Sequence, residues 1–414
     1  MERKNIELMA PAGSYESLMA AIQGGADSVY FGIEKLNMRS HSSYNFTIED
    51  LPKIVSVTQK HNIKTYLAVN TVIYDEELEL IGEIISGVKQ AGVNAVIASD
   101  QSAIMAAREA GIEIHLSTQL NISNIQSLKF YANYADVVVL ARELTLEQIG
   151  KIARSVKYQD IKGPSGKRIR IELFIHGAFC MAISGICYIS LHQYNYPANR
   201  GECLQACRRA YIVSDKETGQ ELEIDREYIM SPKDLCTISF IDKILDAGVE
   251  VLKIEGRARS PEYVKTVTAC YAEAIEACLS KTYTKSKIKE WETRLAEVFN
   301  RGFWDGYYLG RKVGEWSRSY GSAATKRKKY IAKGINYYSR IRVGEFLMEN
   351  EGLKVGDEII ITGPTTGVIQ TIIEEIHVDR GPVKEAFKGE YFSIPLDQPI
   401  RPSDKLYKIV GNNE

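Results

Sequence analysis

Short apolar runs alternate with amphipathic segments through the first 280 residues of the chain. Eight of these runs have the length of buried strands, and they cover residues 6–9, 28–31, 64–69, 95–98, 113–116, 137–140, 169–175 and 251–254. Between most of them lie stretches with the apolar spacing of helices, such as 75–91 and 145–155, and glycines precede several strands. Eight strand–helix repeats predict an α/β fold, a (β/α)8 TIM-like barrel rather than an open sheet.

The pattern changes after this region. Residues 261–280 and 287–299 have helical spacing, and from residue 330 short strands alternate with Gly, Pro and Asp turns. The strands expected there cover 339–346, 358–362, 367–377, 391–395 and 405–409, which indicates a small antiparallel β-barrel. We therefore expect a barrel over 1–280, a helical extension and linker over 281–329, and a small β-barrel domain over 330–414. The connection 177–248 is abnormally long, and such insertions are usually functional.

Composition and charge narrow the class of protein. The net charge is −1 and 45% of the residues are apolar, as in globular proteins. No apolar run approaches the ~18 residues that span a bilayer. The first ten residues are charged, lead into a strand and show no signal peptide, so we expect a cytoplasmic protein without a membrane partner. Residues 326–342 hold seven basic residues, no acidic one and three tyrosines, which suits either a solvated linker or an RNA-binding groove.

Five of the seven cysteines fall within 57 residues of the long connection: Cys180, Cys187, Cys203, Cys207 and Cys236. Their neighbours are mostly Gly, Ser, Asn, Arg and Gln, which favours metal or iron–sulfur ligation over inert core thiols. Disulfides are a further alternative that fits poorly without a signal peptide. Only Cys203 and Cys207 form the tight pair that zinc sites prefer. The wide spacing of the others favours a four-iron cluster, with zinc as the less favoured metal.

Polar residues follow the predicted strands at the end where (β/α)8 barrels carry their active sites. Arginines bind carboxylates or phosphates through paired hydrogen bonds. We therefore predict a binding site for a cofactor or small carboxylate metabolite from Arg39, Asn70, Gln119, Arg142 and Arg257. The residues predicted to be catalytic are His176, Glu172, Arg142, Glu255 and Arg257. The alternative is that the arginines pair with rim carboxylates and that the histidine is structural. The hydrolase motifs H-E-x-x-H and G-x-S-x-G are missing.

Several blocks of the sequence resemble the collagenase-like peptidase family U32. They are ELFIHGAFC at 172–180, GICYIS at 185–190, ELMAPAG at 7–13, LSTQ at 116–119, RGEC at 200–203, SPKDLC at 231–236, LKIEGR at 252–257 and NRGF at 300–303. The likeness runs from residue 7 to about 320, and the segment after it is similar to a domain appended in that family. Members understood as hydroxylation proteins carry an oxygen-sensitive four-iron cluster. They act on ubiquinone precursors, ribosomal RNA or the wobble uridine of tRNA.

The length and the appended domain look most like the tRNA wobble-uridine hydroxylation proteins. This resemblance implies a 4Fe-4S cluster, tRNA as substrate, 5-hydroxyuridine as product and prephenate as a co-substrate. It also implies Cys180, Cys187, Cys203 and Cys236 as cluster ligands, with Cys207 as the alternative to Cys236. The family's name implies a second function, a metal-dependent peptidase, although no nucleophile–base pair can be assigned. A third hypothesis is a non-catalytic subunit that works with a paralogous protein in a hydroxylation complex.

Overall fold

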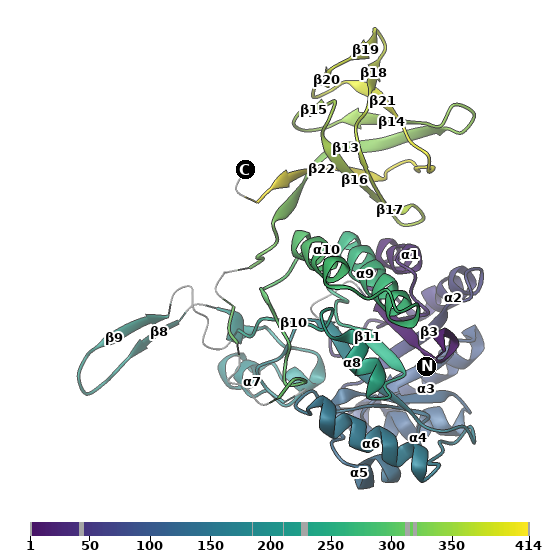
Figure 1. Cartoon of the computed structure of the whole chain (residues 1–414), viewed down its shortest axis with the longest axis vertical. Coiled ribbons are helices and arrows are strands. Elements are labelled where there is room, and N and C mark those ends of the chain that lie inside the picture. Colours follow the sequence, from purple (N-terminus) through teal and green to yellow (C-terminus); the bar gives the residue numbers. More distant parts are fainter. Residues whose placement is uncertain are drawn as a thin grey trace.

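The computed structural model describes residues 2–40, 45–183, 185–209, 211–224, 231–310, 315–317 and 321–412. All eight predicted barrel strands are present, as β1 (Glu7–Pro11), β2 (Ser28–Phe31), β3 (Lys64–Val69), β4 (Ala95–Ala98), β5 (Glu113–Leu116), β6 (Val137–Val139), β7 (Arg170–Gly177) and β11 (Val251–Ile254). They are parallel neighbours in chain order, and β11 pairs with both β7 and β1. The predicted (β/α)8 barrel is thereby confirmed as a closed barrel (Figure 1).

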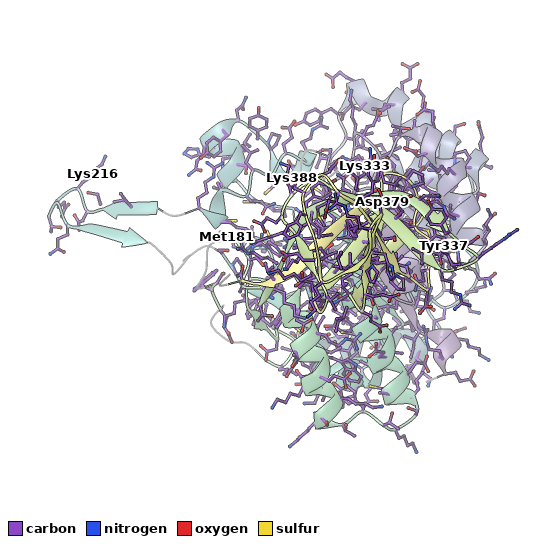
Figure 2. The ribbon with its side chains drawn as sticks, turned by 90° about the horizontal axis from the view of Figure 1, so that it is seen from above. Met181, Lys216, Lys333, Tyr337, Asp379 and Lys388 are labelled. Carbon is purple, nitrogen blue, oxygen red and sulfur yellow. The ribbon has the colours of Figure 1, made fainter. Side chains whose placement is uncertain are left out.

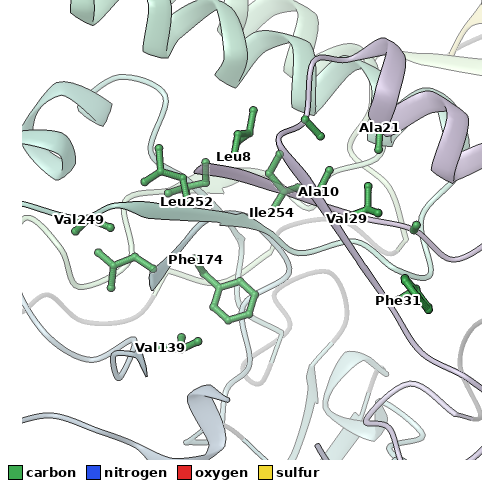
Figure 3. Close-up of a cluster of buried hydrophobic side chains, with 14 of the residues drawn as sticks. Leu8, Ala10, Ala21, Val29, Phe31, Val139, Phe174, Val249, Leu252 and Ile254 are labelled. Carbon is green, nitrogen blue, oxygen red and sulfur yellow. The ribbon is translucent and has the colours of Figure 1, made fainter. Parts of the chain in front are cut away.

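Helices cover the outside of the barrel and follow the strands in turn. They are α1 (Tyr15–Gln23), α2 (Leu51–Gln59), α3 (Leu78–Ala91), α4 (Gln101–Glu109), α5 (Ile125–Tyr131), α6 (Leu146–Tyr158), α8 (Ile241–Asp246) and α9 (Pro261–Leu279), with α10 (Lys285–Glu297) packed on α9. Side-chain oxygens of Ser14, Asp100, Asn124 and Thr145 accept backbone N–H groups where four of these helices begin. Apolar side chains of the strands and helices form one continuous core, part of which is drawn in Figure 3.

The inside of the barrel holds a second, smaller set of apolar side chains, comprising Met9, Tyr30, Tyr66, Ala95, Ile97, Val137 and Val251. Charged groups are buried among the same strands. Lys253 Nζ lies 2.8 Å from Glu172 Oε1, and His115 Nδ1 lies 3.5 Å from Glu172 Oε2. Buried ions of this kind must be paired, because an isolated charge inside the barrel would be strongly destabilising.

The connection after β7 extends the sheet and carries a projecting hairpin. Strand β10 (Asp234–Cys236) runs antiparallel to β7, and β12 (Phe303–Trp304) pairs with β10. The short helix α7 (Ile189–Tyr194) lies within the insertion. Strands β8 (Tyr211–Ser214) and β9 (Glu221–Ile224) pair as a hairpin that stands away from the rest of the molecule, as the position of Lys216 in Figure 2 shows.

The C-terminal domain is built on an eight-stranded antiparallel sheet. In sheet order its strands are β17 (Gly367–Ile372), β16 (Glu358–Gly363), β22 (Lys405–Gly411), β13 (Lys326–Tyr338), β14 (Val343–Met348), β21 (Tyr391–Pro395), β18 (Ile376–Val378) and β19 (Gly381–Val383); β15 (Leu353–Lys354) pairs separately with β20 (Glu385–Ala386). The start of this domain differs from the prediction. Strand β13 begins at Lys326, so residues expected in the linker belong to a 13-residue strand. The strand expected over 339–346 begins only at Val343, and the one over 367–377 is two strands.

The small domain packs against the barrel through β17. Gln23 of α1 donates from Nε2 to the carbonyl of Thr366 and accepts the N–H of Val368, both at 2.9 Å. Lys265 of α9 donates to the Val368 carbonyl at 2.7 Å. The domain therefore lies beside the first and last barrel repeats (Figure 1). Among the residues that the structure describes, no helix is long and apolar enough to cross a membrane.

Candidate functional site

A cavity of about 220 Å³ lies between the C-terminal ends of the barrel strands and the cysteine-rich insertion. The barrel contributes both apolar and polar walls, and the insertion contributes aromatic and thiol groups. Its lining includes Tyr30, Arg39, Asn70, Ser117, Gln119, Arg142, Phe174, Lys253, Glu255 and Arg257 from the barrel, and Phe179, Cys180, Cys187, Cys203, Cys207 and Arg208 from the insertion. The cavity is thus at the end of the barrel where the sequence placed the site.

Four of the five clustered cysteines line this cavity: Cys180, Cys187, Cys203 and Cys207. Cys236 does not. It ends strand β10, pairs across to His176, and its Sγ lies 3.9 Å from the hydroxyl of Tyr271 on α9. The structure therefore brings Cys207 together with Cys180, Cys187 and Cys203, which is the alternative ligand set. Cys236 lies instead on the strand that pairs with β7, close to α9. The spacing in sequence did not distinguish the two, because the direction of β10 decides where Cys236 points.

The four thiols of the cavity are donors that either a zinc ion or an iron–sulfur cluster can use. Burial raises the pKa of Cys207 to about 11, although Arg208 opposes the shift, so this thiol stays protonated at neutral pH until a metal binds. Within the described residues, no three His, Cys, Asp or Glu side chains are close enough to hold one metal ion. A zinc ion needs its sulfurs about 2.3 Å from one point. A four-iron cluster takes one thiolate at each of four separate irons.

Two of the predicted arginines have partners within the protein. Arg39 Nη2 lies 2.9 Å from Glu255 Oε1, and Arg257 Nη1 donates to Asn37 Oδ1 at 3.0 Å. Burial favours the protonated form of Glu255, but Arg39, Arg142 and Arg257 outweigh it and lower the pKa of this carboxyl to about 2. Glu255 is therefore a fixed negative charge at neutral pH and not a proton carrier. The sequence offered ion pairing with a rim carboxylate as the alternative to ligand binding by the arginines, and Arg39 forms such a pair with Glu255.

Arg142 differs from these two arginines. Its Nη1 donates only to the carbonyl of Ala178, at 3.3 Å, and its guanidinium carbon lies 3.9 Å from the ring centre of Phe174. Its Nε is buried and has no hydrogen-bond partner in the described part of the chain. A buried donor without a partner carries a desolvation cost that an anionic ligand would remove. Arg142 therefore presents a buried donor without a partner at the cavity.

The two predicted amides lie side by side at the cavity wall. Asn70 Nδ2 donates to Ser117 Oγ at 3.4 Å, and Gln119 Oε1 accepts from the hydroxyls of Ser99 at 3.0 Å and Ser117 at 3.3 Å. These bonds hold together the segments that follow β3, β4 and β5. Their amide N–H groups can offer hydrogen bonds to the edge of a bound base or to a carboxylate.

His176 and Glu172, which were predicted to be catalytic, do not line the cavity. His176 is 1% exposed, and its Nδ1 lies 3.3 Å from the Tyr271 hydroxyl between β7 and α9. Burial, together with Arg259, lowers its pKa to about 3, so it is a neutral core residue. Glu172 is fully buried inside the barrel and paired with Lys253. The structure gives both residues a packing role.

Several cavity residues were not predicted from the sequence. Phe174 and Phe179 supply aromatic walls, and Lys253, Arg208, Arg259 and Arg301 supply charge. Arg208 could have been found, because it directly follows Cys207. Arg301 belongs to the NRGF block, but it lies far beyond the last barrel strand, and its place at the site depends on the packing of β12 against β10.

The first part of the basic stretch 326–342 is strand β13 rather than a solvated linker. Three of its lysines are engaged in ion pairs. Lys326 pairs with Glu358 at 2.9 Å, Lys328 with Glu262 of α9 at 2.8 Å, and Lys329 with Glu351 at 3.6 Å. These lysines stabilise the small domain and its contact with the barrel. The sequence did not reveal these ion pairs, because the carboxylates are distant from the lysines along the chain.

The fold and site define a (β/α)8 barrel protein whose mouth is covered by a cysteine-lined insertion. The model of Peptidase family U32 matches residues 13–318, and the chain belongs to this family. It is 58% identical over 414 residues to a protein named collagenase from Porphyromonas gingivalis, with all of both chains covered. It is 32% identical to tRNA hydroxylation protein P1 of Bacillus subtilis, covering 98% of this chain and 95% of that one. It is 33% identical to a 23S rRNA 5-hydroxycytidine synthase of Escherichia coli, covering 74% and 46%.

Proposed function

We propose that this chain is an iron–sulfur-dependent RNA-modifying enzyme that hydroxylates the wobble uridine of tRNA to 5-hydroxyuridine. The observation that carries the proposal is the set of four thiols, drawn from separate parts of the insertion, that lines one cationic cavity. The relatives named for tRNA and rRNA hydroxylation support the reaction class. We further propose a cytoplasmic location, where tRNA is available.

Cys180, Cys187, Cys203 and Cys207 would hold the cluster, which supplies one-electron redox chemistry when bound. The chain's own residues set the charge around it. Seven basic side chains and one carboxylate line the cavity: Arg39, Arg142, Arg208, Lys253, Arg257, Arg259 and Arg301, with Glu255. Outside the lining, Glu172 pairs with Lys253 and Asp234 pairs with Arg301. Among the described residues, seven positive side chains and three carboxylates are therefore grouped at the cavity, an excess of four positive charges. Such an excess favours anionic substrates.

Arg142 is the group that we propose for a small carboxylate co-substrate such as prephenate. Its unpartnered Nε and its contact with Phe174 combine a charge-assisted hydrogen bond with an apolar surface for a ring. The amides of Asn70 and Gln119 would orient the remaining polar groups. Arg39 and Arg257, which already have partners, would act mainly by holding Glu255 and the cavity wall in place.

A peptidase is the second candidate function, because the 58% identical relative is named collagenase. The cavity offers little support for it. Both His115 and His176 are buried outside its lining, so neither is placed to act as a general base there. Peptide hydrolysis requires an activated nucleophile or a metal-bound water. Neither is assembled at the cavity by the side chains that line it.

The proposal is tested by deleting the gene and measuring 5-hydroxyuridine in digested tRNA by mass spectrometry. The modification should disappear and return with wild-type protein or Cys270→Ala, whose thiol is buried on α9, but not with Cys180→Ala. Unchanged tRNA in the deletion strain would contradict the proposal. Gelatin cleavage by anaerobically purified protein, lost in Cys180→Ala, would favour the peptidase instead. Hydroxylation that needs a second, paralogous protein would make this chain one subunit of a complex.

A further inference from the structure

Three guanidinium groups line one wall of the cavity, and two of them pair with the same carboxylate, Asp234. Arg301 Nη1 lies 3.4 Å from Asp234 Oδ1, and Arg259 Nη2 lies 3.9 Å from Asp234 Oδ2. The side chains of Arg259 and Arg301 are 15% and 13% exposed, and Asp234 is 2% exposed. Arg208 lines the same wall. One carboxylate can balance only one of these three positive charges.

The three arginines are held in place by neighbours that do not neutralise them. Arg208 donates from Nη1 to Ser231 Oγ at 3.0 Å and from Nη2 to the carbonyl of Phe179 at 2.9 Å. The guanidinium carbons of Arg259 and Arg301 lie 3.6 and 5.0 Å from the ring centre of Phe299. Groups that are already ordered lose little entropy when they bind a ligand.

The surplus of positive charge at this wall is costly without an anion. Burial lowers the pKa of Arg301 to about 10, and Arg208 and Arg259 act in the same direction while Asp234 opposes them. All three side chains are nevertheless charged at neutral pH. The cost arises because like charges in a partly buried site repel one another, and a bound anion would reverse it.

Arg259, one of the three arginines, lies at the wall of two cavities. Arg208, Arg259 and Arg301 line the cavity that holds the four cysteines. Arg259 also lines a second cavity of about 840 Å³ between the barrel and the small domain, together with Lys328, Lys405 and other residues. A strand bound at Arg259 is therefore next to both cavities.

We propose that Arg208, Arg259 and Arg301 form a clamp for one phosphodiester of the RNA, next to the nucleotide that enters the cavity. The inference rests on the proposed function and adds the group that positions the RNA strand. The planar guanidinium fork matches the oxygens of a phosphate, and two uncompensated charges exceed the single charge of one phosphodiester. The clamp contacts the backbone, so it positions the nucleotide without reading its base.

The test is RNA binding by a variant that removes two of the three clamp arginines without leaving a buried charge. Arg259→Gln and Arg301→Gln are combined with Asp234→Asn, because the carboxylate would otherwise lose its partners. Binding of a fluorescent anticodon stem–loop is followed by anisotropy over a salt series. We expect about tenfold weaker binding and a log-affinity versus log-salt slope that is lower by about 0.7 for each lost phosphate contact. The control Arg154→Gln, at a cavity beside the N-terminal ends of the strands, should change neither.

A second arm identifies the phosphate. Neutral methylphosphonate is placed at each phosphate flanking the target uridine in turn. One substitution should weaken binding to the wild type and to Asp234→Asn, but not to the clamp variant. If both proteins respond equally, or if inorganic phosphate binds at the arginines without displacing the RNA, the clamp is refuted while the proposed function stands. A wild-type protein that binds no RNA would overturn both. Circular dichroism melting of each variant verifies the fold.

Discussion

Replacing Lys253 tests how much its buried ion pair with Glu172 contributes to the stability of the barrel. Its Nζ lies 2.8 Å from Glu172 Oε1, with the two side chains 5% and 0% exposed. Lys253→Met keeps the length of the side chain and removes its charge, which leaves Glu172 with only His115 nearby, at 3.5 Å. Removing one partner of a buried ion pair costs about 3–5 kcal/mol. We expect the free energy of unfolding of the barrel to fall by that amount.

The assay is urea denaturation followed by tryptophan fluorescence. All three tryptophans, Trp291, Trp304 and Trp316, precede the small domain, so their emission reports unfolding of the barrel. The double variant Lys253→Met with Glu172→Gln removes both charges and should recover most of the loss. A single variant that costs less than about 1 kcal/mol, or a double variant as unstable as the sum of its singles, would refute the reasoning. Recovery would also confirm that Glu172 is structural.

Two other variants test the barrel and the cysteine loop. Arg170 and other neighbours overcome burial to lower the pKa of Glu7 from 4.5 to about 2, which corresponds to about 3 kcal/mol at roughly 1.4 kcal/mol per pKa unit. That stability is present above pH 4.5 and is lost as the pH falls towards 2, so Glu7→Gln should flatten the acid-denaturation curve. Gly201→Ala should lower the iron content, because Gly201 has a φ of +86° and a Cβ would lie 2.4 Å from the carbonyl oxygen of Asn37. Gly219→Ala, also at positive φ but with open space around it, should keep its iron.

The barrel was predictable because its strands are buried on both faces. Such strands appear in sequence as short continuous apolar runs, and helix caps and glycines separate them. Strand β13 was missed because its outward positions carry lysines and tyrosines, whose partners Glu262, Glu351 and Glu358 come from other elements. Charge patterns alone cannot distinguish a paired surface from a free one.

The site was predictable in its location but not in the direction of each side chain. His176 was expected at the mouth because it directly follows the predicted strand 169–175. The register with β11 shifts between Lys253 and Ile254, and the irregularity accompanies a His176 side chain that packs against Tyr271 on α9. Cys236 ends β10, whose antiparallel course was not visible in the apolar pattern. Both misplacements depend on pairings between strands rather than on local sequence.

The measurement that most directly tests the central claim is the iron and acid-labile sulfide content of anaerobically prepared protein. We predict about four irons and four sulfides per chain in the wild type and in Cys236→Ser, and their loss in Cys207→Ser. The reason is that Cys207 lines the cavity with Cys180, Cys187 and Cys203, whereas Cys236 points towards α9. Retention of iron in Cys207→Ser with loss in Cys236→Ser would contradict the ligand set. Colourless wild-type protein with one zinc per chain would contradict the cluster itself.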